Sequence, residues 1–272
     1  MTSEVIQVFQ DIIYSYFKQY GRNFPFRDKI KPYYVLISEI MLQQTQTSTV
    51  SEKFLNFIKS FPDFEALSKA PKQKLLKAWQ GLGYNRRAIA LKNIAEIIVN
   101  DYEGKLPDLS IEKLKEFPQI GHNTASSIST FAFNKPNIFI ETNIRRVYIY
   151  FFFPKNNSVN DKDIMPLIEA TVDKEQPREW YYALMDYGVM LKKTHPELNK
   201  RSAHYRKQAQ FKGSNREIRG KILKILLNKK EILMTELQNQ LKVENKRLIS
   251  ILNQLEKEGF IENNEMIIKI SN

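Results

Sequence analysis

Residues 117–128 read FPQIGHNTASSI and join two predicted helices through a turn of only four residues, PQIG. The stretch IEKLKEF (111–117) has the apolar spacing of a helix, and the same spacing returns in 122–133. Pro118 and Gly121 permit the tight turn between them. The second helix would expose its first backbone N–H groups, which form an anion site. The segment is typical of a helix–hairpin–helix, a sequence-independent phosphate clamp on DNA, although packed helices also use such turns.

Helical spacing extends from this turn over most of residues 1–191. Prolines and glycines separate the segments, and no convincing run of alternating strands appears between them. The helices are expected at 4–20, 33–42, 50–61, 72–80, 85–100, 111–117, 122–133, 138–152, 161–173 and 178–192. Residues 1–191 are therefore predicted to form one all-α domain.

The C-terminal part has a different composition. Residues 192–214 are predicted to be a basic linker, because residues 192–213 hold seven Lys or Arg and one Glu. A linker that follows a phosphate backbone and a solvated connector both account for this charge. In 215–272, helices at 215–228, 233–241 and 244–258 precede two strands around the turn Asn263-Asn264, which predicts a winged-helix-like α+β domain. The third helix is only mildly basic, so DNA binding and protein docking both remain open for it.

The overall composition narrows the function classes. The chain has 272 residues and a formal net charge of +12, which favours nucleic acid as a partner, although a generally basic proteome would also produce such a charge. Cysteine is absent, which removes disulfides, thiol nucleophiles and cysteine-ligated iron–sulfur clusters. The three histidines lack metal-type spacing, and no apolar run is long enough for a membrane span. We expect a cytoplasmic, nucleoid-associated protein without a metal site.

Two glutamates stand inside apolar runs. Glu39 lies in YYVLISEIML (33–42), and Glu141 lies in KPNIFIETNIRRVYIYFFF (135–153). A carboxylate is costly to bury unless it is paired, protonated or used in chemistry. For Glu141 a local explanation also exists, since Thr142 or Asn143 would cap a following helix and Glu141 would favour its dipole.

Five segments of the chain resemble the MutY adenine DNA glycosylases in order and spacing. They are ISEIMLQQTQTSTV (37–50), AWQGLGYNRRA (78–88), FPQIGHNTA (117–125), FIETNIRRV (139–147) and YYALMDYGVML (181–191). The similarity covers roughly residues 8–192, and the block around MLQQTQ is its most specific part. MutY belongs to the helix–hairpin–helix glycosylase superfamily, which also includes endonuclease III. The resemblance implies a two-lobed, all-α glycosylase fold.

The resemblance also implies catalytic roles. Glu39 matches the glutamate that protonates the flipped adenine, and an apolar pocket would raise its pKa so that it stays protonated near neutral pH. Glu141 stands where the family has an aspartate that stabilises the oxocarbenium-like sugar. Asn123 stands where endonuclease III has its Schiff-base lysine, and an amide cannot form that imine. A monofunctional glycosylase, without a strong lyase step, is expected.

DNA-contacting residues follow from the same resemblance. Gln44 and Tyr84 would be wedge residues beside the emptied space, with ordinary packing as the alternative, and Gln43 would contact the flipped nucleotide or its partner. The hairpin carbonyls are a candidate site for a monovalent cation, as in relatives. The other expected DNA contacts are Thr45, Arg86, Arg87, Gln119, Gly121, His122, Thr124, Asn143, Arg145, Lys200 and Arg201.

The sequence departs from the family in two further ways. The four cluster-ligating cysteines are missing, and the winged-helix-like segment replaces the Nudix-like module that reads 8-oxoguanine. We expect a monomeric glycosylase that acts on double-stranded DNA with a mismatched or damaged base, foremost adenine opposite 8-oxoguanine or guanine. The alternatives are another base on the same scaffold (hypoxanthine, or thymine or uracil opposite guanine) and a non-catalytic DNA-binding protein.

Overall fold

The computed structural model describes residues 1–207, 209–264 and 266–271. The chain forms two units, of which the first contains residues 1–39 and 106–207 and the second contains residues 40–105 and the C-terminal residues from 209 on. The first unit contains most of α3 (Pro32–Leu42) together with α1 (Ser3–Tyr20), α2 (Pro25–Asp28), α8 (Ile111–Lys115), α9 (His122–Phe133), α10 (Thr142–Phe152), α11 (Asp161–Thr171), α12 (Pro177–Thr194) and the 3-10 helix η1 (Pro196–Arg201).

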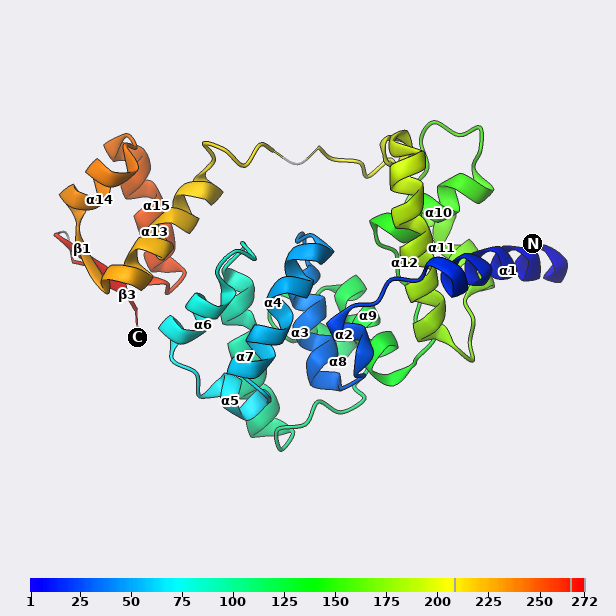
Figure 1. The fold of residues 1–272 in the computed structure, drawn as a ribbon, viewed down its shortest axis with the longest axis horizontal. Helices are drawn as coiled ribbons and strands as arrows, with labels where there is room; N and C mark the ends of the chain where they lie inside the picture. The colour runs from blue at the N-terminus through cyan, green and yellow to red at the C-terminus, as the bar shows by residue number, and fades with distance from the viewer. Residues whose placement is uncertain (208, 265, 272) are drawn as a thin grey trace. The chain divides into compact units, whose positions relative to one another are not determined.

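The core of the first unit forms where α1, α10 and α12 pack together (Figure 1). Phe9 of α1 contacts the rings of Tyr148 on α10 and Trp180 on α12, and all three side chains are buried. A Cβ at Gly188 of α12 would lie 2.4 Å from the carbonyl oxygen of Asn143, so only glycine allows α12 to approach the start of α10 this closely. The packing thereby fixes the position of the α10 N-terminus.

The second unit combines four helices of the all-α region with the C-terminal residues. Phe57 and Phe61 of this unit pack against each other, and Phe57 also contacts the buried ring of Trp79. The four helices are α4 (Thr47–Ser60), α5 (Phe64–Ser68), α6 (Lys72–Trp79) and α7 (Arg86–Asp101). In the part of the chain that the structure describes, no helix has the length and apolarity needed to cross a membrane.

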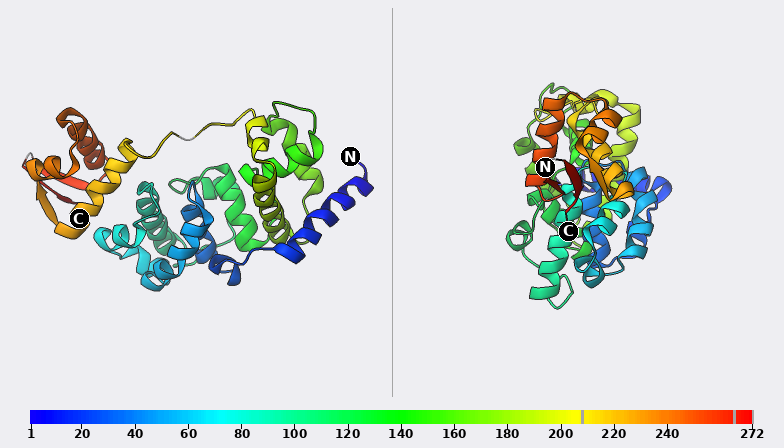
Figure 2. Two further views of the ribbon diagram at one scale, coloured as in Figure 1. Left: turned by 45° about the horizontal axis from the view of Figure 1, so that its top comes forward. Right: turned by 90° about the vertical axis from the view of Figure 1, so that its left-hand side faces the viewer.

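The C-terminal residues form a small α+β module, in which α13 and α15 contact the strands of a three-stranded antiparallel sheet (Figure 2). The sheet has the order β1-β3-β2, and Ile232 pairs with Ile268 while Glu262 pairs with Lys269. The elements are α13 (Asn215–Lys229), β1 (Glu231–Leu233), α14 (Met234–Leu241), α15 (Asn245–Lys257), β2 (Ile261–Asn264) and β3 (Ile267–Ile270). The predicted all-α fold with a winged-helix-like α+β part is confirmed, with β1 as an additional third strand.

Two segments differ locally from the expectation. Helix α10 begins at Thr142 and not at residue 138, and residues 138–140 precede it as non-helical chain that buries Phe139 and Ile140. Residues 196–201 form η1 instead of an open linker, and η1 packs on α10. The chain after η1 forms a bridge between Val159 and Ser202, so the first part of the basic stretch belongs to the folded first unit.

Candidate active site

Helix α3 carries Glu39 among buried apolar neighbours. Ile37 and Ile40 are fully buried, and Glu39 itself is partly buried and is the only charged residue of the helix. The Ser127 hydroxyl on α9 donates a hydrogen bond of 2.6 Å to Glu39 Oε2. Burial raises the pKa of Glu39 to about 7; the bond from Ser127 and the charge of Arg27 act against the rise, and the charge of Glu141 adds to it. Both protonation states of Glu39 are therefore accessible near neutral pH.

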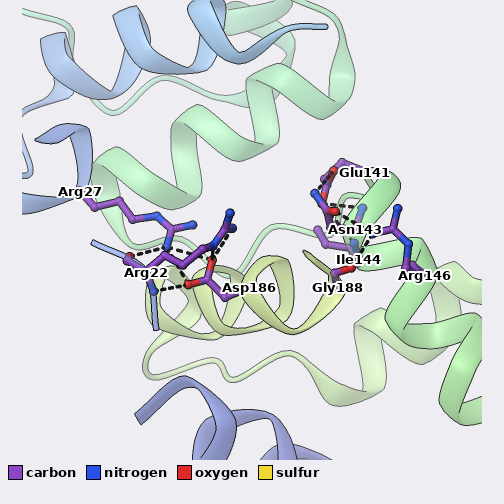
Figure 3. A network of polar contacts seen from close by, with 8 residues as sticks. All are labelled: Arg22, Arg27, Glu141, Asn143, Ile144, Arg146, Asp186 and Gly188. Atoms are coloured by element: carbon purple, nitrogen blue, oxygen red, sulfur yellow. Dashed lines mark hydrogen bonds and ion pairs between the residues drawn. The ribbon is translucent and has the colours of Figure 1, made fainter. Parts of the chain in front are cut away.

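Glu141 lies at the start of α10 and caps that helix with its own side chain. Its Oε1 accepts from the backbone N–H groups of Asn143 and Ile144 at 2.9 and 3.1 Å, and its Oε2 accepts from Asn143 Nδ2 at 3.2 Å (Figure 3). The pKa of Glu141 is raised above its ordinary value by burial, and these three bonds together with the charge of Arg146 reduce the rise without cancelling it. All three donors are N–H groups, which favour the ionised carboxylate. Two of them are backbone N–H groups at the start of α10, so Glu141 is the cap of this helix, and Thr142 and Asn143 are not.

The side chains of Arg146 and Asn123 hold the Glu141 segment in place. Asn143 Oδ1 accepts from Arg146 Nη1 at 2.8 Å, and Arg146 Nη1 also donates to the Gly188 carbonyl at 2.5 Å (Figure 3). Asn123 Nδ2 on α9 donates to the carbonyl of Ile140, directly before Glu141, at 2.8 Å. The hairpin helix and α12 therefore both position the second carboxylate.

A third carboxylate of the first unit, Asp186 on α12, has no pattern in the sequence that marks it. It is 2% exposed and accepts from the Arg22 backbone N–H at 2.7 Å and from Arg22 Nη2 at 2.6 Å. Arg27 Nη1 adds a further bond at 3.2 Å (Figure 3). Two guanidinium groups thus compensate Asp186, which marks it as a structural ion pair.

The hairpin turn before α9 keeps the features of an anion site. Gly121 is the N-cap and supplies no capping side chain, so the first N–H groups of α9 have no side-chain cap. Gln119 adopts the left-handed backbone region with φ of +64°, and His122 and Asn123 are exposed while Thr124 is half-buried. The hairpin cation remains a prediction.

Arg87 is the expected DNA contact whose placement differs most from the expectation. Its side chain is buried, and Nη1 donates to the carbonyls of Ile40, Met41 and Gln43 at the end of α3. Its Nη2 donates to Thr45 Oγ1 and to the carbonyls of residues 82 and 83. Helix C-termini leave carbonyls without intrahelical partners, and Arg87 satisfies them here instead of facing phosphates.

The remaining expected DNA contacts have varied surroundings. Tyr84 and Gln44 are exposed and have φ of +47° and +55°, and the Tyr84 hydroxyl accepts from Arg216 Nη1 on α13 at 2.7 Å. Arg86 pairs with Glu258 at 2.6 Å. In the first unit, Arg145 pairs with Asp161, Arg201 donates to the carbonyls of Phe153 and Asn156, and Lys200 is exposed.

The residues present do not fit the iron–sulfur cluster of the MutY resemblance, because the chain has no thiolate to offer. Within the described ranges, no group of three or more His, Asp or Glu side chains is arranged to hold a metal ion. Ser127 and Arg27 belong to the site but were not found from the sequence. Ser127 is separated from its hydrogen-bond partner Glu39 by 88 residues in the sequence, and a buried serine in a helix has no sequence pattern that marks it.

This unit is helical and contains a helix–hairpin–helix whose second helix contacts the segments of two carboxyl groups. Such an arrangement is typical of the base-excision DNA glycosylase fold. The solved structure of a thermostable thymine-DNA glycosylase is similar, with a TM-score of 0.62 and 27% identity, and the match covers 74% of this chain and 96% of that one. Residues 37–172 match the HhH-GPD superfamily of base excision DNA repair proteins, and the chain belongs to that family.

Two curated relatives illustrate the range of the family. The adenine DNA glycosylase of Buchnera aphidicola subsp. Baizongia pistaciae is 36% identical over 71% of this chain and 55% of its own length. The thymine/uracil-DNA glycosylase of Methanothermobacter thermautotrophicus is 29% identical over 70% of this chain and 87% of its own length. The chain thus spans about half the length of the adenine relative.

Proposed function

We propose that the protein is a monofunctional DNA glycosylase that hydrolyses the N-glycosidic bond of a base flipped out of double-stranded DNA, foremost adenine opposite 8-oxoguanine or guanine. The observation that carries the proposal is the pair Glu39 and Glu141: Glu39 accepts a hydrogen bond from the Ser127 hydroxyl, Glu141 accepts bonds from backbone N–H groups of α10, and the charge of Glu141 raises the pKa of Glu39. Membership of a base excision repair family supports it. We take the protein to act as a cytoplasmic monomer on nucleoid DNA.

The two carboxyl groups divide the chemistry between them. Glu39, with its pKa raised to about 7, is the acid that protonates a ring nitrogen of the base and makes it a neutral leaving group. Glu141 accepts hydrogen bonds from N–H groups of the α10 terminus, which favour its anion, and it stabilises the positive charge that develops on the sugar. Glu39, once ionised, can then activate the water that completes hydrolysis. Asn123 offers no amine, so no imine to the sugar forms.

Backbone geometry supports the DNA-binding part of the proposal. Gln44, Tyr84 and Gln119 all adopt positive φ, which costs free energy for residues other than glycine and concentrates at functional sites. The uncapped start of α9 offers N–H groups to a phosphate. The three residues with positive φ and the start of α9 all lie where the resemblance implies contact with DNA.

A second candidate is the excision of thymine or uracil opposite guanine. It is favoured by the thymine/uracil relative, which matches this chain over most of its own length. Glu39 favours a purine instead, since protonating a ring nitrogen helps a purine leave most.

The test is an excision assay on end-labelled duplexes that carry A:8-oxoguanine, A:G, hypoxanthine:T, T:G or U:G. The proposal predicts strand cleavage of an adenine duplex only after hot alkali, because a monofunctional enzyme leaves an intact abasic strand. Cleavage confined to T:G and U:G would establish the second candidate. The absence of cleavage in every duplex, with DNA binding retained, would leave the non-catalytic alternative.

A further inference from the structure

The hydroxyl of Ser127 stands between two acceptors and has one hydrogen to give. Its Oγ lies 2.6 Å from Glu39 Oε2 and 3.0 Å from the carbonyl oxygen of Thr124 in the preceding turn of α9. The carbonyl can only accept a hydrogen bond, whereas a carboxyl group donates or accepts according to its protonation. The bonding around Ser127 therefore depends on whether Glu39 is protonated and on which of its oxygens carries the proton.

Both protonation states of Glu39 find a partner in this arrangement. When Glu39 is ionised, the Ser127 hydroxyl donates to Oε2, a charge-assisted bond. When Oε2 carries the proton, Glu39 donates to Ser127 Oγ, and the Ser127 hydrogen turns to the Thr124 carbonyl. When the proton is on Oε1, Ser127 still holds Oε2 and leaves the proton free for a base. A guanidinium at the same place would favour only the anion.

Other charged and titratable groups on three neighbouring elements interact electrostatically with Glu39. They are Glu141 at the start of α10, Arg27 on α2 and Tyr182 on α12. The charge of Glu141 raises the pKa of Glu39 and that of Arg27 lowers it, while burial raises the pKa of Tyr182 to about 12, which keeps its hydroxyl neutral at physiological pH. Ser127 differs from the charged groups Glu141 and Arg27 in being neutral, and it donates a hydrogen bond directly to the acid.

We propose that Ser127 is the positioning residue of the acid: it holds Oε2 of Glu39, directs the reactive proton to Oε1, and stabilises the carboxylate as that proton moves to the base. The inference rests on the proposed function for the identity of the acid. The proton balance is simple, because the hydrogen lost from Oε1 bonds to the ring nitrogen of the base while the Ser127 hydrogen stays on its own oxygen. Ser127 therefore acts through Glu39 and does not touch the substrate.

The test compares Ser127→Ala with Ser126→Ala. Ser126 is the neighbouring buried serine of α9, and its hydroxyl has no hydrogen-bond partner within the described residues. Both variants remove a buried hydroxyl from one helix, and alanine suits a helix interior, but only Ser127→Ala removes a bond to Glu39. We expect Ser127→Ala to slow single-turnover excision about tenfold at pH 6, the loss typical of one hydrogen bond to a charged group. Ser126→Ala should stay within about twofold of the wild type.

The pH profile separates positioning from a merely structural effect. The Ser127 bond lowers the pKa of Glu39. Its loss should therefore raise the pH at which the excision rate begins to fall by about one pH unit. If Ser127→Ala slows excision but the rate falls at the same pH as in the wild type, the proposal is overturned. It is also overturned if Ser126→Ala moves that pH by the same amount.

A measurement without substrate keeps this inference apart from the proposed function. In protein with ¹³C-labelled glutamate carboxyl groups, the Glu39 resonance is assigned by its loss in Glu39→Gln and titrated in the wild type and in both serine variants. We expect a higher midpoint in Ser127→Ala alone. Equal midpoints would refute the role of Ser127 even if excision is observed. If no duplex is cut, the proposed glycosylase activity is refuted. The titration then still tests whether Ser127 is hydrogen-bonded to Glu39.

Discussion

Asp186 and Glu39 are both carboxyl groups surrounded by protein in the first unit, and they are stabilised in opposite ways. Asp186 accepts hydrogen bonds from the guanidinium groups of Arg22 and Arg27, so its charge is compensated on site. Glu39 meets the hydroxyl of Ser127, and burial raises its pKa to about 7. A compensated carboxylate holds the fold together, whereas one left with a hydroxyl exchanges a proton near neutral pH.

Glu141 stands between these two cases. Its hydrogen bonds come from the N–H groups at the start of α10 and from the Asn143 amide, and these donors favour its ionised form. Burial raises the pKa of both carboxyl groups, but only Glu141 accepts bonds from three N–H groups that favour its anion, whereas Glu39 accepts one bond from a hydroxyl. This difference in hydrogen-bond donors supports the proposal that Glu39 is the acid and Glu141 the anion.

Glu39→Gln should produce the largest effect. Loss of a positioned acid should lower single-turnover excision by about 10²- to 10⁴-fold while DNA affinity persists. A carboxyl group with a raised pKa costs folding stability as the pH rises through that pKa, so at pH 8 the variant should unfold at an equal or higher temperature than the wild type. Excision kinetics and thermal unfolding measure the two parts. Near-wild-type excision would remove Glu39 from the role of acid.

Asp186→Asn should act on stability. Removing one partner of a buried pair leaves the Arg27 charge uncompensated, and we expect a loss of about 3–5 kcal/mol in the free energy of unfolding. Urea denaturation measures it, with Asp11→Asn as a control because Asp11 is exposed. If Asp186→Asn unfolds at the same urea concentration as Asp11→Asn, Asp186 is not the structural ion-pair partner described above.

Glu141→Asp restores the residue that the MutY family has. Aspartate also caps helices, so stability should change by less than about 1 kcal/mol. The carboxylate would move by about an ångström relative to a backbone that is fixed by Gly188 and Asn123, and excision should slow about tenfold. A rate equal to or faster than the wild type would show that the site accepts the family geometry.

The smallest effect concerns the basic stretch after α12. Neutral substitutions at Lys200, Arg206 and Lys207 should flatten the slope of log affinity against log salt by about 0.9 for each phosphate that the protein no longer neutralises. Arg201 is left unchanged because it holds the carbonyl of Asn156. An unchanged slope in a filter-binding titration would make the stretch a connector.

The sequence predicted those features that depend on local pattern. The turn PQIG, the helix at 122–133 and the placement of Glu39 in a buried helix follow from apolar spacing and from Pro and Gly. The predicted helix at 138–152 begins too early because residues 138–140 are apolar like the helix itself. Only the cap formed by Glu141 shows where the helix begins.

Features that depend on tertiary contacts could not be read from the sequence. Arg86 and Arg87 are adjacent and chemically identical, yet packing turns Arg87 inward to the end of α3 and leaves Arg86 at the surface. Strand β1 exists because three residues pair with β3, a partner more than 30 residues later in the chain. Ser127 and Asp186 gained their roles only from residues brought close by folding.

The central claim is that excision requires a protonated Glu39, and the pH dependence of the single-turnover excision rate tests it most directly. With the pKa of Glu39 raised to about 7, the protonated fraction is nearly complete at pH 5.5 and falls above pH 7. The account predicts a rate that is level at low pH and decreases about tenfold per pH unit on the basic side. A rate that stays level or rises up to pH 9 would contradict it.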